Sequence, residues 1–432
     1  MKAYHYARTP ILAAALALLL GCGNEGAGFT GVNDNPPGAG GGAGGGGGPG
    51  VTIEPRLAYQ PEAGTALFDL AIAGNADRAV FVSNENPLGQ NPDGGEQIFA
   101  VDIGSGGLVQ VTIEPETASV AFADFDITDD GLQVVFVSSE DITGDNPANR
   151  PNVFLAATDG SSVSQVTSLA AGSLGDPEIS EDSTVIIFRS ESDLTGDNPA
   201  GNMQIFSINS DGSSLFQVTT GNPVASELAF SDDGSRIAYQ GLNDPFGMNA
   251  DATREIFVIN IDGTGLAQLT MTDGDSFAPR LSDGGSRVVF TSRAEHIAGT
   301  NPDGNYEVYV ANTDGTGLTQ ITTNARDSGT FTSGAPGALD ISGNGSYVVF
   351  GSVADLTGEN DQLTHTIFWA SVVGGEIGQP LRDGTVPSSI SSRAADNPHL
   401  TNDGAGILFD SRVNYSFDST GDDDKIFTTV RQ

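Results

Sequence analysis

Cysteine and lysine are almost missing from this chain of 432 residues. The single cysteine, Cys22, has no partner for an intrachain disulfide and no second thiolate for a paired metal site. Lysine occurs only at Lys2 and Lys425, and 56 acidic residues against 17 basic ones give a net charge of −39. Because such a charge repels phosphate groups, the composition argues against nucleic acid or anionic lipid as a partner. The charge is otherwise typical of a soluble surface or of a site that attracts cations.

Long apolar runs are missing too, apart from residues 11–20. This run is too short to span a bilayer and follows the basic residues Lys2 and Arg8, which is typical of a signal peptide. The next residues, Leu-Leu-Gly-Cys at 19–22, resemble the bacterial lipobox, which implies cleavage before Cys22 and lipidation of Cys22. Gly23, and not Asp, follows this cysteine, which by resemblance to lipoprotein sorting implies the outer membrane, on its periplasmic or cell-surface side. An ordinary secretory signal with an incidental cysteine is the alternative.

Composition divides the chain into three parts. Residues 1–21 are predicted to be a lipoprotein signal peptide, residues 22–50 a lipidated cysteine with a glycine-rich tether, and residues 51–432 the folded part. The tether contains GAGGGAGGGGGPG and almost no large apolar side chain, so it cannot bury enough surface to order itself. We therefore expect the folded part to contact the membrane only through its lipid anchor, across a span of roughly 30 Å.

The folded part is an array of seven related units. An aromatic residue ends the second predicted strand of each unit, at steps of 51 to 60 residues: Phe81, Phe136, Phe188, Tyr239, Phe290, Phe350 and Phe409. A second aromatic follows 18 residues later, or 19 in the fifth unit: Phe99, Phe154, Phe206, Phe257, Tyr309, Phe368 and Phe427. A threonine 13 residues further on closes the fourth strand at Thr112, Thr167, Thr219, Thr270 and Thr322.

Each unit has the chemistry of four short antiparallel strands. Runs such as Val288-Val289-Phe290 are rich in β-branched and aromatic residues, and Asp-Gly pairs such as Asp314-Gly315 suit tight hairpin turns. Apolar residues nowhere follow a helical period of useful length. The pattern predicts an all-β fold, a seven-bladed β-propeller of four-stranded antiparallel blades.

The seventh unit contains only three predicted strands before the chain ends. Residues 51–55, VTIEP, repeat residues 111–115, which end the fourth strand of the first unit. We therefore expect the N-terminal strand to complete the last blade as its outer strand and to protect an open edge. A three-stranded last blade is the alternative.

Two segments, SDDGSRIAYQG at 231–241 and REIFVINIDGTGLAQLT at 254–270, resemble the TolB-type, WD40-like propeller repeat. The resemblance covers roughly residues 62–432 and implies the fold far more than a function. The Trp-Ser-Pro-Asp-Gly common in TolB-type repeats is absent, and no segment is suited to the α/β domain that precedes the propeller of TolB. TolB's partners are therefore not carried over. Prolyl-oligopeptidase-like enzymes carry similar propellers, but this sequence lacks a Gly-x-Ser-x-Gly elbow.

The first candidate site lies on the innermost strands, where residues two apart share a face. Units 1 to 4 are mostly acidic at these positions, and Arg280 and His399 stand opposite. The candidate ligand-binding residues are Asp69, Asp124, Asp126, Asp176, Glu178, Glu227, Arg280, Asp340 and His399. One interpretation is a site for a cation or a positively charged ligand at the channel mouth. The other is a water-filled channel lining in which Arg280 pairs with Glu178 or Asp340.

The second candidate site is the loop between the second and third strands, which repeats Asp-x-Thr-Gly-Asp-Asn-Pro. Its glycine suits a positive-φ turn, and its Asp and Asn side chains can bond backbone amides. The sharper interpretation is calcium, which takes several oxygen ligands from a compact loop. The candidate metal ligands are Asp141, Asp145, Asp193, Asp197, Asp355 and Glu359. His296 stands in place of the aspartate in the fifth unit, which argues against an ion in every blade, and the fold requires no cofactor.

Catalysis has little support in the sequence. His296, His365 and His399 follow the signal segment without metal-ligand spacing, and no catalytic residue is assigned. The sequence favours an envelope-anchored, monomeric propeller that binds or scaffolds a protein partner without catalysis. The alternative is a polysaccharide-acting enzyme, a lyase or hydrolase, with its site at the acidic channel mouth, because some TolB-like propellers are lyases.

Overall fold

The computed structural model describes residues 56–59, 67–75, 77–113, 123–169, 173–221, 224–323, 339–352, 354–358, 366–380, 396–411 and 425–430. All regular elements in these ranges are β-strands. Within them, no helix is long and apolar enough to cross a membrane. The predicted signal peptide, Cys22 and the tether lie outside the described residues.

Six blades are each formed by four consecutive strands that pair in chain order. The first three contain β2 (Leu67–Ile72), β3 (Arg78–Ser83), β4 (Gln97–Asp102) and β5 (Leu108–Gln110); β6 (Ala123–Ile127), β7 (Gln133–Ser138), β8 (Asn152–Ala157) and β9 (Val163–Gln165); and β10 (Leu174–Ile179), β11 (Val185–Ser190), β12 (Gln204–Asn209) and β13 (Phe216–Gln217). The next three contain β14 (Val224–Phe230), β15 (Arg236–Gly241), β16 (Glu255–Asn260) and β17 (Ala267–Gln268); β18 (Ser276–Leu281), β19 (Arg287–Ser292), β20 (Glu307–Asn312) and β21 (Thr319–Gln320); and β22 (Leu339–Ile341), β23 (Tyr347–Ser352), β24 (Thr366–Ser371) and β25 (Ile377–Gly378). All neighbouring strands are antiparallel.

A composite four-stranded sheet joins the two ends of the chain. Its order is β1-β28-β27-β26, from β1 (Arg56–Tyr59), β26 (Asp396–Leu400), β27 (Gly406–Ser411) and β28 (Lys425–Val430). Strand β1 is the outer strand, as expected for closure by the N-terminal segment, although residues 51–55 themselves lie outside the described residues. Blades of consecutive strands therefore number six and not the predicted seven, because the last unit supplies only three strands of the composite sheet.

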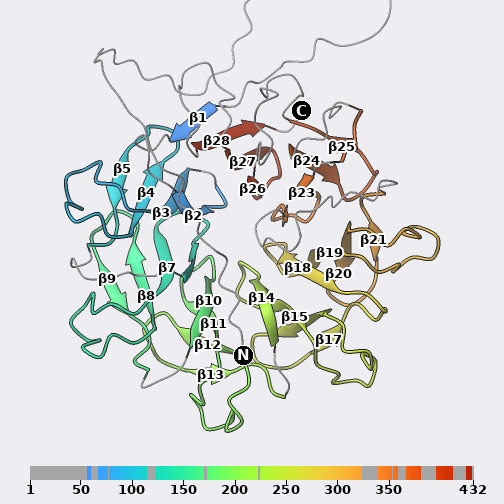
Figure 1. The fold of residues 1–432 in the computed structure, drawn as a ribbon, viewed down its shortest axis with the longest axis horizontal. Coiled ribbons are helices and arrows are strands. Elements are labelled where there is room, and N and C mark those ends of the chain that lie inside the picture. Colours follow the sequence, from blue (N-terminus) through green and yellow to red (C-terminus); the bar gives the residue numbers. More distant parts are fainter. Residues whose placement is uncertain are drawn as a thin grey trace, which may run out of the picture.

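The sheets surround a centre toward which their first strands face, as β2, β10, β14, β18 and β26 show in Figure 1. Backbone hydrogen bonds link the turns that follow these first strands. Asn344 N donates to Asn402 O at 3.2 Å, and Asn402 N donates to Gly74 O at 3.2 Å. The composite sheet is thus bonded to the blade on either side of it.

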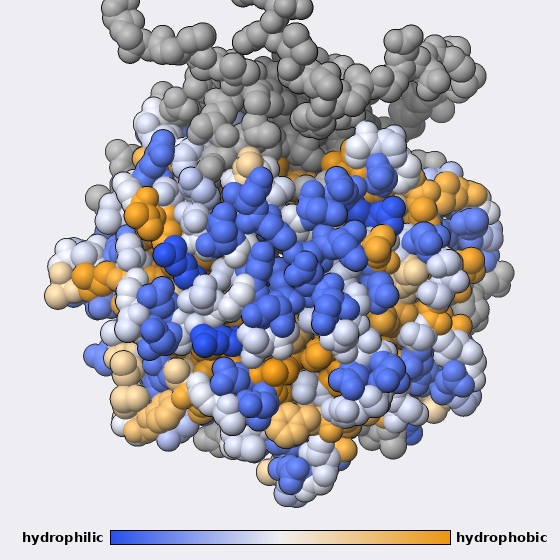
Figure 2. All heavy atoms as spheres, turned by 180° about the vertical axis from the view of Figure 1, so that it is seen from behind, coloured by the Kyte–Doolittle hydropathy of each residue, from blue (hydrophilic) through white to orange (hydrophobic). Residues whose placement is uncertain are grey.

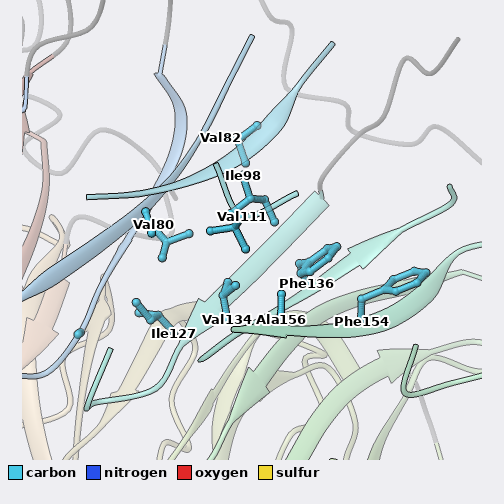
Figure 3. Close-up of a cluster of buried hydrophobic side chains, with 11 residues drawn as sticks. Val80, Val82, Ile98, Val111, Ile127, Val134, Phe136, Phe154 and Ala156 are labelled. Carbon is cyan, nitrogen blue, oxygen red and sulfur yellow. The ribbon is translucent and has the colours of Figure 1, made fainter. Parts of the chain in front are cut away.

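The apolar core lies between adjacent blades. Figure 3 shows one cluster, in which Val80, Val82 and Ile98 of the first blade face Val134 and other side chains of the second. The two aromatic residues of each unit are cross-strand partners that stack at 5.4–5.9 Å with interplanar angles of 15–22° in all six blades of consecutive strands. The constant spacing in the sequence therefore reflects a cross-strand ring pair.

The repeated threonines hold the fourth strand to the third. Each Oγ1 accepts, at 2.9 Å, the amide of the residue before the third-strand aromatic: Ile98, Val153, Ile205, Ile256 and Val308. The same hydroxyl donates to a third-strand side chain, as Thr112 does to Gln97 Oε1 at 2.8 Å. These groups are buried, so the threonine hydroxyl supplies the hydrogen-bond partner that the third-strand amide would otherwise lack.

Strand direction assigns each connection to a face of the ring. Because neighbouring strands alternate, the turns after the first and third strands lie on one face, here called the hairpin face. The loops between the second and third strands, and the connections between blades, lie on the other, here called the loop face. The centre of the ring, which the first strands surround between these two faces, is here called the channel.

Candidate functional site

A break in strand pairing positions the channel residues. In β10 the register shifts between Gly175 and Glu178, and comparable shifts occur in β2, β6, β14, β18 and β26. A bulge of this kind turns the side chains that follow it. Asp176 and Ala278, at equivalent positions of two blades, have φ values of 46° and 52°. This left-handed backbone costs a non-glycine residue roughly 1–2 kcal/mol, so backbone strain is concentrated at the channel wall.

Four of the predicted channel carboxylates tie one blade to the next. Each accepts a backbone amide from the innermost strand of the following sheet. The bonds run from Ile179 N to Asp126 (3.0 Å), from Phe230 N to Glu178, from Ala278 N to Glu227 (2.7 Å) and from Leu400 N to Asp340 (2.9 Å). Removing such an acceptor would leave a buried amide without a partner at a cost of about 1–3 kcal/mol, so these side chains stabilise the junctions between blades.

Arg280 places a positive charge among these carboxylates. Desolvation raises the pKa values of Asp126, Glu178, Glu227 and Asp340, and the charge of Arg280 lowers each in part. The pKa of Asp126 reaches about 6. Desolvation and the neighbouring Asp126 raise the pKa of Glu178 well above its usual range. Arg280 Nη1 donates to Pro279 O at 2.9 Å, and the charge of Arg280 lowers the pKa values of Glu178 and Asp340 in part.

The remaining predicted residues divide into three groups. His399 lies beside Asp340, with Nδ1 3.8 Å from Oδ2, and desolvation lowers the pKa of His399 while Asp340 raises it in part. Asp176 forms an ion pair with Arg189. The side chains of Asp69 and Asp124 lie outside the described residues, although their backbones belong to β2 and β6.

A carboxylate cluster on the hairpin face was not predicted from the sequence. Asp129, Asp232 and Asp283 come from the turns after β6, β14 and β18, and their carboxylate oxygens lie within 4.8 Å of one another. Desolvation, followed by the charges of Asp129 and Asp283, raises the pKa of Asp232 to about 10. Asp232 therefore keeps a proton at neutral pH and donates it in a hydrogen bond to Asp283.

Two glycines leave room for this cluster. A Cβ at Gly74 would lie 2.3 Å from Asp129 Oδ1, and a Cβ at Gly343 would lie 1.9 Å from Asp283 Oδ2. Asn402 Nδ2 donates to Asp129 Oδ2 at 2.5 Å. The sequence did contain a signal for this cluster. The second residue of the turn after the first strand is Asp in three units and Gly in two. Among the described residues, these carboxylates are the group that could hold a divalent cation.

The predicted calcium loops are built around a buried asparagine. Asn146 N donates to Asp141 Oδ1 at 2.6 Å, and Asn198 N donates to Asp193 Oδ1 at 2.8 Å. The asparagine side chain in turn donates to carbonyl oxygens across the loop, as Asn146 Nδ2 does to Arg150 O at 2.8 Å. In these two loops the first aspartate therefore accepts a backbone hydrogen bond that holds the loop in shape. Asp145, Asp197 and Asp355 are exposed, and Glu359 lies outside the described residues, so calcium stays a prediction.

The same loop frame carries different tips. The tip glycine has positive φ in all six blades of consecutive strands: Gly89, Gly144, Gly196, Gly247, Gly299 and Gly358. Around it, the second and third blades present Thr-Gly-Asp, whereas the fourth presents Phe246, Gly247 and Met248. Phe246 and Met248 are each 47% exposed. In the fifth blade His296 is enclosed edge-on by Phe290 and Tyr309, and burial lowers its pKa to about 4.

The surface has polar and apolar zones. Figure 2 shows one face of the ring, where hydrophilic side chains gather over the centre and apolar side chains reach the surface around it. The exposed large apolar residues on blade 4 of the loop face are Leu242, Phe246, Met248 and Met271.

Comparison with known proteins supports the fold. No family model matches the chain. Dipeptidyl-peptidase 5 of Porphyromonas gingivalis is 39% identical over 67 residues, which are 16% of this chain and 10% of that protein. The chain therefore aligns with only a tenth of that relative's length.

Solved structures of similar fold include two oligogalacturonate lyases. One is in complex with manganese, with a TM-score of 0.53, 16% identity and coverage of 88% of this chain and 90% of that one. The other, from Vibrio parahaemolyticus, has a TM-score of 0.55 at 14% identity and covers 87% and 89%. TolB from Acinetobacter baumannii is also similar, with a TM-score of 0.41, 13% identity and coverage of 78% and 76%. At these identities the likeness to the two lyases supports the fold alone, an all-β propeller, and the four-stranded antiparallel blades are those of the structure itself.

Proposed function

We propose that this protein is an envelope-anchored propeller that binds a protein partner through its loop face and does not catalyse a reaction. The proposal includes the sequence predictions of a signal peptide, lipidation at Cys22, an outer-membrane anchor and a monomeric chain. It also treats the composite sheet as the seventh blade, since hydrogen bonds join it to both neighbours.

The observation that carries the proposal is the constant loop frame with variable tips. A buried asparagine and a positive-φ glycine repeat from blade to blade, while the exposed residues change from Gly144-Asp145 to Phe246-Gly247-Met248. A rigid frame presenting different side chains is suited to recognition, because little conformational entropy is lost on binding. The channel carboxylates, by contrast, are occupied with amides of neighbouring blades.

Affinity capture with the full chain from an envelope extract of the native organism tests the proposal. Three chains are compared by quantitative mass spectrometry: wild type, a double variant Phe246→Ser and Met248→Ser, and the control Asp145→Ser at an exposed tip of blade 2. We expect at least one partner to be lost roughly tenfold or more from the double variant and retained by the control. The proposal fails if wild type and double variant recover the same proteins in the same amounts.

A polysaccharide-acting enzyme is the second candidate. The observation that favours it is the pair of carboxyl groups of Asp126 and Glu178. The pKa values of both are raised and the charge of Arg280 acts on both, and perturbed pKa values of this kind are common among catalytic acids and bases. Oligogalacturonate, with and without manganese, is the substrate to test, because a lyase leaves an unsaturated product that absorbs ultraviolet light. Turnover by wild type that Glu178→Gln abolishes would establish the enzyme and overturn the binding proposal.

A further inference from the structure

Four side chains form an arginine–aromatic ladder across the rim between the fourth and fifth blades. The guanidinium carbon of Arg254 lies 5.5 Å from the ring centre of Phe277, and that of Arg293 lies 5.1 Å from the ring centre of Tyr306. The two rings meet edge to face at 5.9 Å. The ladder therefore runs from Arg254 through both rings to Arg293, on the loop face.

The loop frame and the next blade position the ladder. Arg254 and Tyr306 each stand five residues after the buried asparagine of their loop, at Asn249 and Asn301. Arg254 N donates to Asp275 Oδ1 at 2.8 Å, and Ser276 N donates to Arg254 O at 2.8 Å. Arg293 Nε donates to Gly304 O at 3.2 Å. Both guanidinium groups are thus supported by an aromatic face, and binding would immobilise little that is not already ordered.

The ladder arginines differ in their partners from three other arginines of the described ring, which bond the next blade. Arg78, Arg236 and Arg287 reach into the next blade and donate to Thr158, to Thr313 and Gly285, and to Gly345. Arg254 is 41% exposed, and its Nη1 lies 3.5 Å from Oδ2 of Asp275, which is itself 38% exposed. Such solvent-exposed pairs contribute little, so an incoming carboxylate can replace Asp275 at small cost. Arg293 is exposed as well.

Exposed apolar side chains lie on the same blade and the same face. Phe246 and Met248 are at the tip of the loop that ends at Arg254, and Met271, 52% exposed, precedes β18. The two segments are joined where Thr272 N donates to Glu255 Oε1 at 3.2 Å. Aromatic and arginine side chains beside exposed apolar ones are the composition of energetically dominant interface residues.

Charge decides which occupant fits. A long polyanion would be repelled by the net charge of −39, whereas a short segment meets the two arginines within the screening length of about 8 Å. We propose that the ladder binds a peptide segment of the partner protein in which one or two carboxylates flank apolar or aromatic side chains. The carboxylates bond Arg254 and Arg293, and the apolar side chains pack on Phe277, Phe246 and Met248. This inference rests on the proposed function and names the chemistry of the partner.

Fluorescence anisotropy with the full chain tests the ladder. The probe is a labelled octapeptide, Ser-Gly-Glu-Phe-Phe-Glu-Gly-Ser, and its match is the same peptide with glutamine in place of glutamate. We expect the double variant Arg254→Gln and Arg293→Gln to bind the acidic probe roughly tenfold or more weakly, because both charge-assisted bonds are lost. A double variant with lysine at both positions keeps the charge but loses the planar stacking on the rings. We expect its affinity for the acidic probe to lie between that of wild type and that of the double glutamine variant.

Arg150→Gln is the matched control, since Arg150 is an exposed arginine on the equivalent loop of the second blade, and we expect less than a twofold change. Equal affinity of wild type and double variant, equal affinity for both peptides, or binding of polygalacturonate in place of the acidic peptide would each overturn the inference. Partner capture separates the two proposals. If Phe246→Ser with Met248→Ser loses the partner while the arginine variant keeps it, the ladder fails and the proposed function stands. If the acidic peptide binds as expected but no partner is captured, the ladder stands as a peptide-binding site and the proposed function fails.

Discussion

The channel wall and the rim place charged side chains in opposite circumstances. In the channel, Asp126 and Glu178 are desolvated and accept amide hydrogens from the next blade. On the rim, Arg254 and Arg293 lie against ring faces with solvent access. Removing a buried acceptor leaves an amide without a partner, whereas removing an exposed charge costs little stability. The most acidic part of the repeat is therefore suited to holding the ring together, and the rim is suited to recognition.

The largest effect on stability is expected in the channel. Asp126→Ala removes the acceptor of two amides, those of Ile127 and Ile179. We expect a loss of about 2–3 kcal/mol in the free energy of unfolding, measured by urea denaturation. Asp145→Ala, at an exposed loop tip, is the control and should change it by less than about 0.5 kcal/mol. If the two variants have equal free energies of unfolding, Asp126 does not stabilise the junction between blades and this prediction is wrong.

In the carboxylate cluster on the hairpin face, removing a carboxylate should raise the free energy of unfolding. Desolvation and the neighbouring carboxylates raise the pKa of Asp232 to about 10, from an ordinary value of 3.8. Between these values the folded chain binds the extra proton, so its contribution to stability is present in acid and is lost as pH rises. Asp232→Asn should therefore raise the free energy of unfolding by about 2 kcal/mol at pH 7 and by almost nothing at pH 4. A stabilisation that persists undiminished at pH 4 would contradict the assignment of the proton to Asp232.

His296 gives a smaller effect with the reverse slope. Burial lowers its pKa to about 4 from 6.5, so the unfolded chain binds the proton first as pH falls. Stability is fully present above pH 6.5 and declines toward pH 4, by about 1–2 kcal/mol after allowance for partial exposure. His296→Leu should flatten this part of the curve of melting temperature against pH. An unchanged slope in the variant would show that another group titrates there.

The smallest effect on stability is expected on the rim. Arg254→Gln with Arg293→Gln should change the free energy of unfolding by less than about 0.5 kcal/mol, because both side chains have solvent access. Thermal denaturation of this double variant beside wild type checks it. A loss of several degrees would mean that the ladder holds the fourth and fifth blades together, and the contrast between rim and channel would disappear.

Repeat spacing predicted the parts of the fold that depend on neighbours within one blade. The interval between Phe136 and Phe154 implied two strands joined by a loop of fixed length, and these residues are indeed cross-strand partners. Closure by the N-terminal segment was also predictable, since the last unit lacked a strand. The consecutive blades number six because the composite sheet draws its strands from both ends of the chain.

Contacts between blades were harder to predict. The channel positions of Asp126 and Glu178 were found, but which backbone amide each would meet depends on the offset between innermost strands. Asp129, Asp232 and Asp283 converge only because the ring brings turns of three blades to one mouth. The rim ladder likewise joins Arg254 of one blade to Phe277 of the next, and periodicity within a unit carries no signal for such a pair.

Partner capture by two matched double variants of the full chain tests the central contrast most directly. One carries Arg254→Gln and Arg293→Gln on the rim, which remove both guanidinium groups, and the other carries the isosteric changes Asp126→Asn and Glu178→Gln in the channel. We expect the rim variant to lose the partner roughly tenfold or more and the channel variant, although less stable, to retain it. A folded channel variant that loses the partner, beside a rim variant that keeps it, would contradict the account.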